Sequence, residues 1–98
     1  MASGEESSVD LVEVENRLLG SDARRSVIDQ AVRGAFDRVD GEWRITVSEV
    51  KHFSPPWWWV SVQGRAELFE VCFRPSEQSP DLVRGRLVEA LRRRRLVE

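Results

Sequence analysis

Residues 55–62 constrain the fold of this chain more than any other stretch. They comprise two prolines, three consecutive tryptophans and the sequence Val-Ser-Val. The stiff prolines suit the start of a strand, and side chains alternate between the two faces of a strand. One face is then apolar and consists of Trp58, Val60 and Val62. The other face carries Trp57 and Trp59 among polar residues, and it is the main functional clue in the sequence.

Length and composition indicate one small globular domain. The chain has 98 residues, of which 41% are hydrophobic and 33% charged. This balance is typical of a folded domain with a modest core rather than of a disordered chain. The formal net charge of −2 disfavours a dedicated nucleic-acid binder, because such proteins usually carry a basic surface. We expect residues 1–8 to be a disordered tail and residues 9–98 to form a single domain.

Cysteine usage and the lack of long apolar runs predict a cytoplasmic protein. Cys72 is the only cysteine, so neither an intramolecular disulfide nor a multi-cysteine metal site can form. The first eight residues are polar and acidic, unlike a signal peptide. No apolar run approaches the roughly 20 residues that a membrane helix needs. We therefore expect a soluble protein in a reducing compartment, without a membrane partner.

Two segments show the three- and four-residue spacing of apolar residues that is typical of amphipathic helices. The first spans about residues 23–39, with Ser21 or Asp22 as its cap and Gly41 as its stop. The second spans about residues 80–94. It opens with a capping hydroxyl, a proline in the first turn and an acid at the positive end of the helix dipole.

Three further segments alternate apolar and polar residues as strands do. They are residues 42–51, 57–63 and 66–74. The connections between them are short, which makes the strands antiparallel neighbours. The predicted class is therefore α+β: a three-stranded antiparallel meander with two helices packed on one face, in the order α-β-β-β-α.

Residues 9–19 fit neither period cleanly. Apolar and acidic residues alternate here in two short runs that are out of phase. Helical spacing links Leu11, Val14 and Leu18 and fits slightly better. We therefore expect a short additional N-terminal helix, or an irregular segment that docks on the domain.

The polar face of the predicted sheet is the candidate partner-binding surface. An exposed pair of tryptophans is unusual for a monomer and often marks an interface. The candidate contact residues are Trp57, Trp59, Leu68, Cys72 and Arg74. A homodimer of two stacked sheets is the simplest such interface. In the alternative, residues 9–19 fold over this face and bury both rings, and the sequence leaves both options open.

The C-terminal helix supports a second hypothesis, a nucleic-acid-binding module. Its basic residues are Arg84, Arg86, Arg92, Arg93, Arg94 and Arg95. Arginines bind phosphates, and exposed tryptophans can stack on unpaired bases. The element order resembles that of the double-stranded RNA-binding domain. That family places lysines at the start of its last helix, where this chain has Ser-Pro-Asp at 79–81, and its Gly-Pro-x-His loop is absent, so no RNA-binding residue is carried over.

The sequence contains no constellation typical of an enzyme or a cofactor site. His52 is the only histidine, and no acid clearly faces it as an orienting partner. Acids surround the turn at residues 40–41, but their spacing is not that of a calcium-binding loop. Cys72 would be a reactive thiol only if a cation such as Arg74 lowered its pKa. We therefore predict a non-enzymatic domain without metal or cofactor. The third hypothesis is a small enzyme or ligand-binding domain with a pocket near His52 and Phe53, and only this one histidine supports it.

Overall fold

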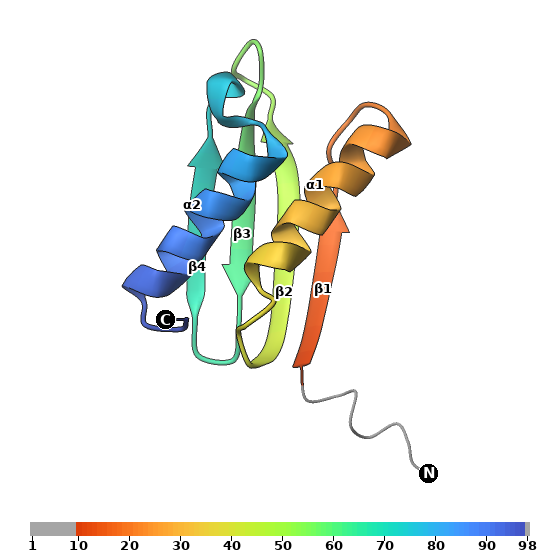
Figure 1. Cartoon of the computed structure of the whole chain (residues 1–98). Coiled ribbons are helices and arrows are strands. Elements are labelled where there is room, and N and C mark those ends of the chain that lie inside the picture. Colours follow the sequence, from red (N-terminus) through yellow and green to blue (C-terminus); the bar gives the residue numbers. More distant parts are fainter. Residues whose placement is uncertain (1–9, 98) are drawn as a thin grey trace.

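The computed structural model describes residues 10–97 and has an α+β fold: one four-stranded mixed sheet with two helices on one of its faces (Figure 1). The strands are β1 (Asp10–Asn16), β2 (Gly41–Val50), β3 (Trp57–Gln63) and β4 (Leu68–Phe73), in that order across the sheet. The helices are α1 (Asp22–Ala35), the short 3-10 helix η2 (Pro75–Glu77) and α2 (Pro80–Arg93). The predicted tail at residues 1–8 lies outside the described residues.

The predicted antiparallel meander is present, but it is part of a larger sheet. β2, β3 and β4 pair antiparallel in chain order, as expected from their short connections. β1 adds a fourth strand beside β2 and runs parallel to it. Parallel neighbours need a long crossover, and α1 supplies it, so the chain begins with a βαβ unit.

The prediction for residues 9–19 was wrong, because residues 10–16 form a strand and not a helix or an irregular segment. Val12 and Val14 face the helices and pack against the core, and glutamates alternate with them on the other side. Leu18, which supported the helical interpretation, lies in the loop after β1 and is buried. Leu18 is apolar because it packs in the core from a loop. Its spacing from Leu11 and Val14 therefore resembled that of a helix, although the backbone of the segment is not helical.

Helix α1 begins as predicted and ends earlier. The Ser21 hydroxyl accepts a hydrogen bond from the backbone N–H of Arg24 at 3.1 Å, which caps the first turn. The helix ends at Ala35, and tighter turns follow it. Phe36 and Val39 are still buried, so the apolar spacing continues beyond the last helical residue. Helix α2 is capped in the same way by Ser79.

The core lies between the sheet and the two helices. Its strand residues are Trp43, Ile45, Val47, Trp58, Val60, Val62, Phe69, Val71 and Phe73. Its helical residues include Ile28, Val32, Ala35, Val83, Leu87 and Leu91. The predicted inward face of the tryptophan strand is confirmed, since Trp58 is 3% exposed and its two inward valines are fully buried. Because both helices cover the same face, no helix among residues 10–97 covers the other face of the sheet (Figure 1).

Candidate functional site

The surface of interest is the open sheet face, the side of the sheet opposite α1 and α2. Within residues 10–97 no helix lies on it (Figure 1). Strand alternation and register place these residues on it: Glu13, Glu15, Arg44, Thr46, Ser48, Val50, Trp57, Trp59, Ser61, Gln63, Leu68, Glu70 and Cys72. The alternative that residues 9–19 fold over Trp57 and Trp59 was wrong. Residues 10–16 form β1, which extends the sheet at its edge beside β2 and does not lie on either face.

Aromatic rings cluster at one end of the open sheet face. The ring of Phe53, from the loop between β2 and β3, stacks on Trp57 with centroids 4.6 Å apart and an interplanar angle of 16°. The ring centroids of His52 and Phe53 are 4.8 Å apart, and the guanidinium of Arg74 lies 5.8 Å from the ring centroid of Trp57. Sequence reasoning did not assign Phe53 to this surface, and its position in a loop next to the tryptophan strand was the available signal.

Trp59 is the accessible centre of this end. It pairs across the sheet with Ser48 on β2 and Cys72 on β4, so its ring stands between two small side chains. Its exposed fraction is 36%, and that of Phe53 is 39%. A large ring with small neighbours leaves room on both sides for side chains of a partner. The two residues are therefore the most accessible part of the aromatic cluster.

The predicted contact set is divided by the structure. Trp57, Trp59, Cys72 and Arg74 lie together at the aromatic end. Leu68 is 70% exposed but pairs with Gln63, four residues along β4 from Cys72. At about 3.3 Å per residue this places it roughly 13 Å away along the strand. Leu68 therefore belongs to the opposite, polar end of the face.

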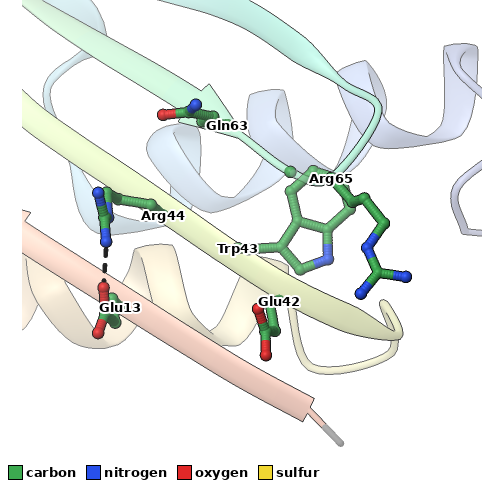
Figure 2. Close-up of a pocket in the computed structure, with 7 residues that line it drawn as sticks. Glu13, Glu42, Trp43, Arg44, Gln63 and Arg65 are labelled. Carbon is green, nitrogen blue, oxygen red and sulfur yellow. Dashed lines mark hydrogen bonds and ion pairs between the residues drawn. The ribbon is translucent and has the colours of Figure 1, made fainter.

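The polar end contains a shallow pocket of about 390 Å³ (Figure 2). An ion pair between Glu13 and Arg44, at 3.3 Å, crosses from β1 to β2 among the residues that line it (Figure 2). The side chain of Trp43 closes one wall, and it lies so near Gly64 that a β-carbon there would come within 2.7 Å of the ring. The pocket is lined by Glu13, Glu42, Trp43, Arg44, Gln63, Gly64 and Arg65. Two acids balance two arginines, so its charge selects neither a cation nor an anion.

Cys72 is not set up as a reactive thiol. Its side chain is half-buried next to Trp59. Burial, and secondly the negative charge of Glu70, raise the pKa of its thiol above the ordinary 9.0, while Arg86 offsets part of this. A raised pKa lowers the thiolate fraction at neutral pH, and the thiolate is the nucleophile. Arg74, which the sequence suggested as an activating cation, lies over Trp57 instead.

The six arginines of the C-terminal helix point in several directions rather than forming one surface. Arg86 donates to Glu77 at 3.2 Å, Arg93 donates to Glu89 at 3.2 Å, and Arg94 lies 3.9 Å from Glu67 and over the ring of Phe69. The Arg84 side chain lies against Gly34 of α1. Arg92 and Arg95 line a hollow at the C-terminal end with Arg38.

The two parts of the nucleic-acid hypothesis are also on different sides of the molecule. Four of these arginines belong to α2, and Arg94 and Arg95 directly follow it. Helix α2 packs on the covered face, whereas Trp57 and Trp59 lie on the open sheet face. A single strand could not stack on the tryptophans and lie along α2 without passing around the edge of the sheet. The structure therefore does not bring these two sets of residues together.

Three further features of the described part of the chain bear on function. Among residues 10–97 no three His, Cys, Asp or Glu side chains gather as metal ligands would. No helix in the same range has the length and apolar character to cross a bilayer. His52 is exposed at the end of the aromatic cluster.

Comparison with known proteins gives no family for this chain, because the sequence matches no protein-family model and no curated protein.

Proposed function

We propose that this chain is a small, non-enzymatic protein-interaction domain of the cytoplasm, whose contact surface is the aromatic end of the open sheet face. The observation that carries the proposal is the cluster of Phe53, Trp57 and Trp59 on the side of the sheet that no helix of residues 10–97 covers. Aromatic residues at the centre of a surface, surrounded by polar ones, are typical of binding hot spots. The simplest partner is a second copy of the chain.

The charges on the open sheet face favour a protein partner over a nucleic acid. Three glutamates, Glu13, Glu15 and Glu70, lie on this face against two arginines. Of these arginines, Arg44 is paired with Glu13 and Arg74 lies over Trp57. A phosphate backbone would meet more negative than positive charge there. Two serines, Ser48 and Ser61, lie beside Trp59 on this face and can make hydrogen bonds to a protein partner.

A second copy fits the shape of this surface. Two sheets can pack face to face about 10 Å apart, with side chains from the facing sides interdigitating. A two-fold axis would place the same residues of both copies in the interface, so each Trp59 would meet its partner's face. The small side chains of Ser48 and Cys72 beside Trp59 leave space for a ring from the other copy.

The test is the solution mass of the chain and of a variant carrying both Trp57→Ser and Trp59→Ser. For the wild type, sedimentation velocity should show a mass that rises with concentration from 11.3 kDa toward twice that value. The double variant should stay monomeric, because each buried hot-spot aromatic contributes about 2 kcal/mol or more, equivalent to roughly 30-fold in Kd.

Leu68→Ser is the matched control, since Leu68 lies on the same face at its polar end and is more exposed than either tryptophan. It should leave the association almost unchanged. A wild type that remains monomeric at all concentrations would exclude the second copy as partner. Loss of the folded state in the double variant, measured by circular dichroism, would show that the two rings serve the fold and would overturn the proposal.

A further inference from the structure

On each edge strand of the sheet, one backbone carbonyl accepts a hydrogen bond from an arginine of the helix that packs beside it. β1 and β4 are the edge strands. On β1, Arg33 of α1 donates from Nη1 to the carbonyl oxygen of Val12 at 3.0 Å. On β4, Arg86 of α2 donates from Nη1 to the carbonyl oxygen of Cys72 at 2.6 Å. The same device therefore occurs twice, on strands that are far apart in the sheet and in the chain.

The two carbonyls are those that an added strand would use. In a parallel or an antiparallel pair, the backbone groups of successive residues point alternately toward the neighbouring strand and away from it. Since the Cys72 carbonyl reaches Arg86 rather than β3, the backbone of Cys72 and of Glu70 faces outward. Directly after β1, the N–H of Arg17 donates to the Val47 carbonyl of β2 at 2.7 Å. The backbone groups of odd-numbered residues in β1 therefore point toward β2, and those of Val12 point outward.

Each guanidinium is held in place by a second contact. Arg33 donates from Nε to the carboxylate of Asp29, one turn earlier on α1, at 3.1 Å. Arg86 donates to Glu77 at 3.2 Å, and its guanidinium lies 4.9 Å from the ring centroid of Phe73. A charged group fixed beside an edge strand occupies the acceptor and blocks the approach of another backbone.

We infer that Arg33 and Arg86 are edge guards, which prevent a second copy of this chain from extending the sheet through β1 or β4. The second copy is the fitting occupant because its own edge strands match in length: β1 has seven residues and β4 has six. Pairing of β4 with β1 of the next copy would join two different surfaces, and such contacts continue into open polymers. With both edges guarded, the open face is the part of the sheet that remains for association.

The test replaces both guards by methionine, in the wild type and in the Trp57→Ser, Trp59→Ser background. Methionine keeps a long apolar stem but has neither donors nor charge. The mass distribution in sedimentation velocity should shift to species larger than a dimer in both backgrounds, since this association does not use the tryptophans. The backbone amides of Glu70 and Cys72 should then exchange with deuterium more slowly than in the wild type.

Two controls separate guarding from other effects. Arg93→Met adds the same apolar side chain to α2 and removes a pair with Glu89, but Arg93 is not the residue that closes an edge carbonyl, so the mass should not change. Arg86→Lys keeps a donor near the Cys72 carbonyl and should also keep the wild-type mass.

Two results would overturn the inference. One is a folded double-guard variant with the mass distribution of its parent. The other is loss of cooperative thermal unfolding in that variant, because the two arginines would then stabilise the monomer instead of guarding its edges. Failure of the proposed stacked-sheet dimer would leave this inference untouched, because the double-tryptophan background tests the edges alone.

Discussion

The two faces of the sheet place identical residues in opposite environments. Trp58 is 3% exposed under the helices, and Trp59, the next residue, is 36% exposed on the open sheet face. The difference comes from strand alternation, because the helices of residues 10–97 cover only one side of the sheet. The two side chains are chemically identical, so their different roles come from what packs over each ring.

The covered face is complete as a structural unit, and the open one is not. Both helices and the inward strand residues form one continuous core. On the other side, Phe53 and Arg74 contact Trp57, but no second layer within residues 10–97 covers the aromatic cluster. A layer supplied by a partner would complete it, which is the basis of the proposed function.

The largest expected effect contrasts the two neighbouring tryptophans directly. Trp58→Ala should lower the free energy of unfolding by about 3–5 kcal/mol, because it leaves a cavity in the core. Trp59→Ala should lower it by about 1–2 kcal/mol, since this ring is already partly in water. Urea denaturation at a concentration where the chain is monomeric measures both. Equal losses would contradict the distinction between the faces.

A smaller effect concerns the pH dependence at Cys72. Its pKa in the folded chain is raised above 9.0, mainly by burial and then by Glu70. The folded state therefore favours the neutral thiol, so its contribution to stability is present below pH 9.0 and is lost as pH rises through the folded-state pKa. The rate of alkylation by iodoacetamide should reach half its maximum at a higher pH in the folded chain than in urea.

The alkylation measurement also sharpens the comparison of faces. Cys72 lies beside Trp59, so a second copy on the open sheet face would cover both. At fixed pH, the alkylation rate per molecule should fall as the protein concentration rises. In the Trp57→Ser, Trp59→Ser variant it should be independent of concentration, and a fall of the same size there would argue against the aromatic interface.

The smallest expected effect is the response to nucleic acid. We expect no measurable change in the fluorescence anisotropy of a labelled single-stranded RNA at low salt, where any electrostatic binding would be strongest. The arginines of α2 and the tryptophans lie on different sides of the sheet. Binding that weakens steeply with added salt and is lost on replacing Arg92 and Arg95 by Ala would revive the nucleic-acid hypothesis.

Local patterns were enough to predict several elements. The caps at Ser21 and Ser79 and the apolar spacing after them predicted both helices, and alternation predicted which tryptophan faces the core. These features depend on residues within a few positions of one another. Prediction failed where a local pattern continued past the element, as at Phe36, which is buried after the last residue of α1.

The sequence by itself determined the α+β class, the meander and the two faces of the tryptophan strand, because periodicity and capping act over short distances along the chain. Only the tertiary structure decided that residues 10–16 are a parallel edge strand, since their pairing partner is about 31 residues away, as the contact of Glu13 with Arg44 shows. It also decided the stacking of Phe53 on Trp57 and the closure of the edges by Arg33 and Arg86. Such contacts depend on how separate elements are placed in space, and no local pattern encodes that placement.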